Sequence, residues 1–73
     1  MKCELQDVIR LVEDETAREA ASESKLDKLV ADSLEFVNLI MRVNEDFSVD
    51  IPDATVAKID TVHDLFLAIK GEL

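Results

Sequence analysis

The chain is nearly free of the residues that break helices, because its 73 residues include one glycine and one proline. It has three phenylalanines and no tyrosine or tryptophan. Tight hairpins depend on glycine-containing turns and strands are enriched in aromatic residues, so the composition offers little from which to build a β-sheet. Leucine, valine, isoleucine, glutamate and lysine fill the segments between the breaks. We therefore expect an all-α fold.

The first predicted helix spans roughly residues 2–15. Its apolar residues recur at the i, i+3, i+4, i+7 spacing of one helix face, and Leu11 lies outside this row. The row consists of Leu5, Val8, Ile9 and Val12. A long connection over residues 16–28 is expected next, because alanines and serines replace the periodic pattern. We expect Leu26 and Leu29 to enter the core and anchor this connection.

The second predicted helix spans residues 33–47, and the carboxylate of Asp32 before it suits an N-cap. Its apolar face is wide, which predicts contacts with neighbours on more than one side. The face consists of Val37, Ile40, Met41 and Phe47, with Phe36 and Val43 at its edges. This helix is expected to organise the core.

Two further helices are predicted after Pro52, which cannot continue the second helix. Asp53 is expected to cap a short helix. Thr61 and Asp64 have the spacing of a capping box at the start of the last helix, and Gly71 is expected to end it. The apolar row of this helix is Val62, Leu65, Phe66 and Ile69. Three longer helices and one short helix predict a small four-helix bundle.

The charge balance restricts the possible partners. Seventeen acidic and eight basic residues give a net charge of −9 in one predicted domain over residues 1–73. Such a surface repels nucleic acid and anionic membranes, and a basic protein surface is the expected partner. A chain this short has little room for a deep enzyme pocket, so catalysis is not expected.

Cellular context is predicted from what the chain lacks. Its single cysteine, Cys3, fits a reducing compartment and is expected to be an ordinary small residue near a frayed terminus. No apolar run reaches the roughly 18 residues of a membrane span, and no signal peptide opens the chain. We expect a monomeric, cytoplasmic protein.

The sequence contains no recognisable catalytic or metal-binding motif. The single histidine, His63, adjoins Asp64, but no spacing places this pair near Ser33 to form a catalytic relay. We expect a surface or capping role for His63. One cysteine and one histidine are too few for a zinc site, and a calcium-like acidic stretch has Val49 and Thr55 where glycine and glutamate are needed. No metal site is predicted.

Ser33 is the residue for which two interpretations stay open. The local pattern favours a structural role, in which Ser33 caps the second helix. An exposed serine at a helix N-terminus is also a suitable place for a phosphodiester. Free backbone amides and the positive end of the helix dipole favour the added phosphate there.

A longer series of residues begins with Asp32-Ser33-Leu34 and an acidic helix over residues 35–41. It continues with Asn-Glu-Asp-Phe at 44–47, Asp-Ile-Pro-Asp at 50–53, Lys-Ile at 58–59 and Thr-Val at 61–62. In order and spacing, this series resembles the acyl carrier protein family, and the likeness spans nearly the whole chain. The resemblance implies a four-helix carrier domain rather than an enzyme.

Three residues depart from the family pattern. Val30 stands where the family commonly has glycine, which predicts an altered or stiffer loop entry. Asn38 stands where the family usually has an acid, and Phe36 is bulkier than expected beside the presumed partner surface. These departures predict a specialised carrier rather than the housekeeping carrier of fatty acid synthesis.

The resemblance implies that a phosphopantetheinyl transferase attaches 4′-phosphopantetheine to Ser33 covalently, with Asp32 and Leu34 completing the attachment motif. The carrier would hold acyl groups as thioesters and present them to acyltransferases and synthases of fatty-acid, polyketide or related biosynthesis. These enzymes are expected to have basic docking surfaces. The predicted partner-binding residues are Glu35, Met41, Glu45, Asp46 and Asp53.

Five residues are predicted to line a groove that shelters the acyl chain: Val37, Ile40, Met41, Ile59 and Val62. The same residues also suit a plain hydrophobic core. Two alternatives to the acyl carrier stay open, a peptidyl or aminoacyl carrier with the same modified serine and an unmodified acidic interaction module. A Ser33–His63 esterase is a remote third, and the sequence does not specify the acyl group or pathway.

Overall fold

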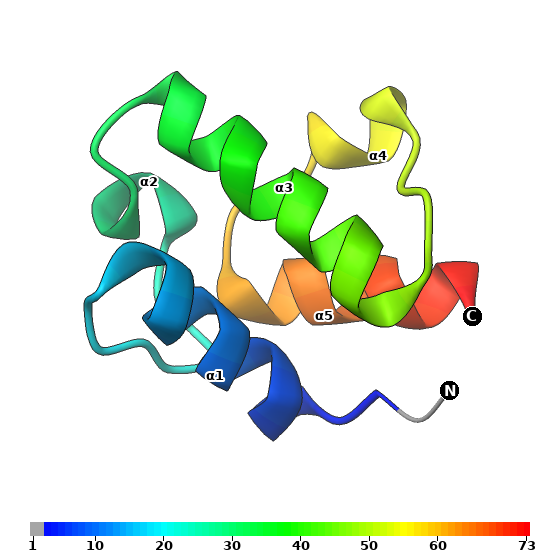
Figure 1. Ribbon diagram of the computed structural model, residues 1–73, viewed down its shortest axis with the longest axis horizontal. Helices are drawn as coiled ribbons and strands as arrows, with labels where there is room; N and C mark the ends of the chain where they lie inside the picture. The colour runs from blue at the N-terminus through cyan, green and yellow to red at the C-terminus, as the bar shows by residue number, and fades with distance from the viewer. Residues whose placement is uncertain (1–2) are drawn as a thin grey trace.

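The computed structural model of the protein describes residues 3–73, and over this range the chain forms five α-helices (Figure 1). They are α1 (Leu5–Thr16), α2 (Leu26–Leu29), α3 (Ser33–Phe47), α4 (Asp53–Val56) and α5 (Val62–Glu72). Three long helices, without strands in the described range, confirm the all-α prediction. The short α2 is a helix that the sequence analysis did not predict, because it lies within the expected connection.

Helix α1 begins at Leu5 rather than near residue 2, and Met1 and Lys2 lie outside the described residues. The Asp7 carboxylate accepts a hydrogen bond from the Glu4 backbone N–H at 3.2 Å, which fixes the start of the helix. Leu11 is buried, contrary to its predicted place outside the apolar row. Because α1 packs against both α3 and α5, its buried face is wider than one row.

Helix α3 crosses the molecule diagonally, with α5 beneath it and α2 near its beginning (Figure 1). It begins at Ser33 after the N-cap Asp32, as predicted. Its buried residues are Leu39, Ile40, Val43 and Phe47. The sequence analysis placed Val37 and Met41 on the buried face, but both are exposed, and it omitted Leu39, which is fully buried. The helix is rotated so that Leu39 and Val43 face the core, whereas Val37 and Met41 face solvent.

The chain after Pro52 forms α4 and α5. Pro52 itself is the N-cap of α4, so Asp53 is the first helical residue and not the predicted cap. The capping box at the start of α5 is confirmed, because Thr61 Oγ1 accepts from the Asp64 N–H at 3.1 Å and Asp64 Oδ2 accepts from the Thr61 N–H at 3.0 Å. Gly71 lies inside α5 and does not end it.

The connection before α2 is attached to the start of α5 by backbone hydrogen bonds. The Leu26 N–H donates to the Asp60 carbonyl at 2.9 Å, and the Val62 N–H donates to the Ser24 carbonyl at 3.0 Å. Leu26 is buried in the core, as is Leu29, which confirms their predicted anchoring role. These contacts bring the loops before α2 and before α5 together, although more than 30 residues separate them.

One hydrophobic core joins the long helices and the short α2. Its members are Cys3, Val8, Leu11, Val12, Leu26, Leu29, Leu39, Ile40, Val43, Phe47, Val49, Ile51, Val62, Leu65 and Ile69. Cys3 is 5% exposed, so it is packed into the core and is not part of a frayed end. Its burial raises the pKa of the thiol, helped by the nearby Asp7 carboxylate. No helix within residues 3–73 has the length and apolar character needed to cross a membrane.

Candidate functional site

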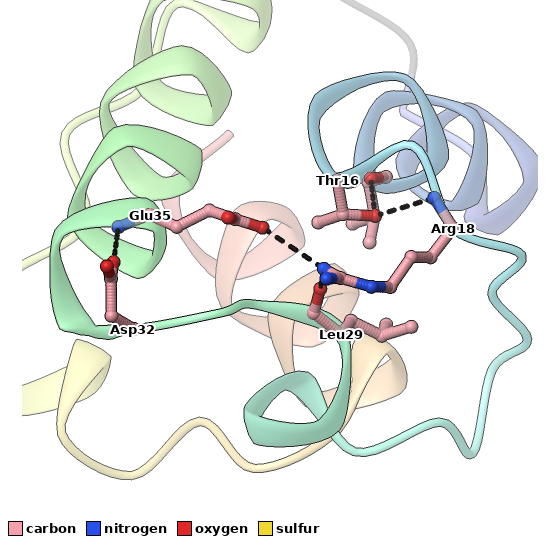
Figure 2. Close-up of polar contacts among 6 residues, drawn as sticks. Thr16, Arg18, Leu29, Asp32 and Glu35 are labelled. Carbon is pink, nitrogen blue, oxygen red and sulfur yellow. Dashed lines mark hydrogen bonds and ion pairs between the residues drawn. The ribbon is translucent and has the colours of Figure 1, made fainter.

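Ser33 lies at the first position of α3, and its side chain is exposed. Asp32 before it has an extended backbone, and Asp32 Oδ1 accepts a hydrogen bond from the Glu35 N–H at 2.9 Å (Figure 2). Asp32 therefore caps the helix, and capping leaves the Ser33 hydroxyl free for another role. The site combines an accessible hydroxyl with the amide-rich beginning of a 15-residue helix.

A hollow of about 440 Å³ opens beside Ser33. Its apolar walls come from α2, α3 and the segment around α4: Leu26, Val30, Phe36, Val56 and Ile59. Asp27, Asp32 and Asp60 add polar groups to the lining. Asp60 pairs with Lys25 at 3.0 Å, and this hydrogen bond raises the pKa of Lys25.

A second hollow of about 240 Å³ lies along α3 and meets α4. It contains three of the predicted groove residues, Val37, Ile40 and Met41. Phe36 and Val56 line both hollows. The predicted groove is thus divided, because Ile59 lines the hollow beside Ser33 and the fully buried Val62 lines neither. We assign Val62 to the core.

Two of the residues that the sequence analysis interpreted as departures from the resembled family meet in the hollow beside Ser33. Val30 and Phe36 both line it and are half-buried. Phe36 therefore shapes this hollow as well as the surface next to it. Asn38 is exposed on α3, where its amide adds no charge. Both positions thus belong to the walls of a cavity, which the sequence alone did not reveal.

The predicted partner-binding acids differ in their pairing. Glu45 and Asp53 are exposed. Asp46 lies 3.5 Å from the Arg42 guanidinium, which also pairs with Asp14 at 2.7 Å and Glu15 at 3.3 Å. Arg42 thus ties α3 to α1, and hydrogen bonds with the α1 acids raise its pKa.

Glu35 is paired as well, with a residue that the sequence analysis missed. The Arg18 guanidinium lies 3.4 Å from Glu35 Oε1 and also donates to the Leu29 carbonyl (Figure 2). Arg18 belongs to the irregular connection after α1, so no periodic pattern marked it. The exposed apolar residues of α3, Leu34, Val37 and Met41, complete the surface around these acids.

The other candidates do not join the site. His63 is exposed in the first turn of α5, as predicted, and it is not among the residues that line the hollow beside Ser33. Its ring is tilted by 40° relative to Phe66 at a centroid distance of 6.0 Å. In the described part of the chain, no three side chains of the metal-binding types come together.

Comparisons with known proteins decide the family. A family model described as the phosphopantetheine attachment site matches residues 4–69. The chain is 43% identical over 54 residues to an acyl carrier protein of Bdellovibrio bacteriovorus, covering 71% of this chain and 69% of that protein. The chain belongs to the acyl carrier protein family. Its membership confirms the resemblance, and an acyl carrier role with a covalently attached 4′-phosphopantetheine follows from it.

Further family members agree with this assignment. An acyl carrier protein of Helicobacter hepaticus is 44% identical over 56 residues, covering 75% of this chain and 74% of the relative. One from Zymomonas mobilis is 54% identical over 41 residues, and the match covers 56% of this chain and about half, 53%, of that protein. A crystal structure of an acyl carrier protein from Thermotoga maritima shares the fold, with a TM-score of 0.73 at 20% identity. It covers 93% of this chain, and 84% of that structure is matched.

Proposed function

We propose that Ser33 is the residue that carries 4′-phosphopantetheine in this acyl carrier protein. The observation that supports this most is the exposed Ser33 hydroxyl at the start of α3, next to a hollow with apolar walls. When bound, the prosthetic group supplies a terminal thiol that holds an acyl group as a thioester. The chain itself then serves as a tethered substrate rather than a catalyst, and residues 1–73 act as one carrier domain.

The residues around Ser33 each have a part in this function. Asp32 caps α3 through the Glu35 N–H at 2.9 Å and so fixes the backbone from which the Ser33 hydroxyl projects. Ser33 Oγ becomes the bridging oxygen of the phosphodiester, and the free amides at the helix start favour the phosphate. Leu34 is 67% exposed beside the attachment point, where it adds apolar surface for an enzyme to contact.

The docking surface that we propose for partner enzymes lies on the exposed side of α3 and extends to α4. It consists of Leu34, Glu35, Val37, Met41, Glu45 and Asp53. Its acids attract basic enzymes, the phosphopantetheinyl transferase first, and its apolar residues supply contact area. Asp46, which we predicted to bind partners, is left out because it lies on the side of α3 that faces α1, where it lines a hollow with Asp14 and Arg42. Exchange of Glu35 for lysine is expected to slow modification most at low salt.

The acyl chain is proposed to enter the hollow beside Ser33. Apolar side chains form most of its named walls, and Phe36 and Val56 connect it to the second hollow along α3. An acyl chain buried there removes apolar surface from water, which stabilises the fold by about 0.8 kcal/mol per buried methylene. The acylated protein should therefore melt at a higher temperature than the unacylated protein with its prosthetic group. Equal melting temperatures for a series of chain lengths would contradict this part of the proposal.

Intact-protein mass spectrometry tests the central proposal. The protein is incubated with coenzyme A and a broad-specificity phosphopantetheinyl transferase, beside Ser33→Ala and Ser48→Gly variants. Ser48 is an exposed serine after α3, and glycine suits its left-handed backbone, φ 55°. We expect the mass of one phosphopantetheine on the parent chain and on Ser48→Gly, and none on Ser33→Ala.

Two other outcomes lead to the alternatives. An unmodified parent chain, under conditions that modify another carrier, would favour an acidic interaction module. Loading of the modified protein with an amino acid instead of an acyl group would favour a peptidyl carrier. The monomeric state and the cytoplasmic location stay predictions.

A further inference from the structure

The connection after α1 turns sharply and directs Arg18 towards the start of α3. Ala17 has a left-handed backbone, φ 57°, and its N–H donates to the Glu13 carbonyl at 2.8 Å. The Arg18 N–H then donates to Thr16 Oγ1 at 3.3 Å, while that hydroxyl donates to the Val12 carbonyl at 2.8 Å. The backbone at Arg18 is thus held by the end of α1, and Figure 2 shows its side chain reaching across to α2 and α3.

The Arg18 guanidinium contacts two elements at once. It donates to the carbonyl of Leu29, the last residue of α2, and lies 3.4 Å from Glu35 Oε1 in the first turn of α3. The guanidinium thus lies between the end of α2 and the first turn of α3. The Arg18 side chain is 48% exposed and the Glu35 side chain 28% exposed, so a protein docking on α3 can reach both.

From this geometry, and resting on the function proposed above, we propose that Arg18 is an internal competitor for the docking carboxylate. Glu35 is two residues from Ser33, and a basic partner that binds there must compete with a guanidinium of this same chain. Arg18 therefore weakens the attraction for basic enzymes at the position closest to the attachment serine. Arg18 thus favours partners that carry a cation able to displace it from Glu35. It also favours partners that carry an acid able to pair with the Arg18 guanidinium.

The size of the effect follows from the exposure of the pair. Exposed ion pairs shift an equilibrium by about 1.4- to fivefold. Removal of the Arg18 charge should therefore raise kcat/KM of the transferase for this carrier by about 1.4- to fivefold at low salt. The gain should shrink at high salt, where screening weakens exposed charges.

A double-mutant cycle tests the proposal with the full chain, coenzyme A and a broad-specificity phosphopantetheinyl transferase. The four proteins are the parent, Arg18→Gln, Glu35→Gln and the double variant. Lys70→Gln is the matched control, because it removes one positive charge from the last turn of α5, away from the start of α3 (Figure 1). Melting temperatures are recorded for all variants, since Arg18 also contacts Leu29.

The expected result is a gain in kcat/KM for Arg18→Gln that disappears when Glu35 is also replaced and that exceeds any gain in Lys70→Gln. An equal gain in the Glu35→Gln background would overturn the proposal, because Arg18 would then act independently of Glu35. An unchanged or lower kcat/KM for Arg18→Gln would also overturn it. In both cases the parent chain is still modified on Ser33, so the proposed function survives. Failure of the parent to gain mass would instead refute the function itself, and this inference with it.

Discussion

Two apolar residues of α3, Leu39 and Met41, provide the sharpest test of how this helix is oriented. The Leu39 side chain is 0% exposed, whereas Met41 is 55% exposed. Both residues favour helices, and alanine favours them at least as much, so replacement by alanine does not weaken the helix itself. Any large difference between Leu39→Ala and Met41→Ala therefore reports tertiary burial.

The magnitude follows from the buried carbons. Leu39→Ala removes three carbons at about 0.8 kcal/mol each, which gives about 2.4 kcal/mol. The cavity that remains raises the loss to about 2.7–5 kcal/mol. A domain of this size is stable by only about 3–5 kcal/mol, so the variant should be close to its unfolding transition without denaturant. Met41→Ala should change the free energy of unfolding by about 0.5 kcal/mol or less.

Urea unfolding followed by far-ultraviolet circular dichroism measures both variants. With a slope of about 1 kcal/mol per molar urea, Leu39→Ala should lower the midpoint by more than about 2 M and leave the slope unchanged. Met41→Ala should keep the midpoint of the parent. A loss below about 1 kcal/mol for Leu39→Ala, or equal losses for the two variants, would refute the orientation of α3 described above.

Three further predictions concern the helix ends. Asp32→Ala should lower the free energy of unfolding by about 1 kcal/mol, whereas Asp32→Asn keeps an acceptor for the Glu35 N–H and should retain most of it; thermal melts compare the two. Ala17→Gly should raise the melting temperature by a few degrees, because glycine adopts the left-handed backbone of this position without strain, and an unchanged or lower value would count against it. Hydrogen bonds from the Thr61 and Asp60 backbones lower the pKa of Asp64. Its contribution to stability is therefore present above the ordinary aspartate pKa of about 3.9 and is lost as the pH falls through the lower folded value. The difference in melting temperature between the parent and Asp64→Asn should thus be larger near neutral pH than in acid, and a constant difference would contradict this.

The Arg18 contact also affects how the acidity of this family member is to be understood. A net charge of −9 suggests a uniformly attractive surface for basic enzymes. Within the region of α3 and α4, however, Arg18 pairs with Glu35 and Arg42 pairs with Asp46, while Glu45 and Asp53 remain exposed. Local pairing, rather than total charge, determines which acids a partner meets first.

The sequence by itself determined the helices whose ends have local causes. Asp32 caps α3 because its carboxylate, one residue before the helix, reaches the backbone N–H of Glu35 three residues further on. This contact needs no residue from a distant part of the chain. The Thr61 and Asp64 capping box has the same local origin. Ser33 was singled out by its immediate neighbours and by a motif series, both of which lie in the linear order of residues.

Only the tertiary structure decided which apolar residues are buried and which charges meet. The wide apolar face of α3 allowed several rotations of the helix, and packing into the core shared with the other helices selected the rotation that buries Leu39 and exposes Met41. Arg18 and Glu35 are 17 residues apart, and only the turn after α1 brings them to one surface. Burial and long-range pairing depend on contacts between segments far apart in the chain, which no local periodicity encodes.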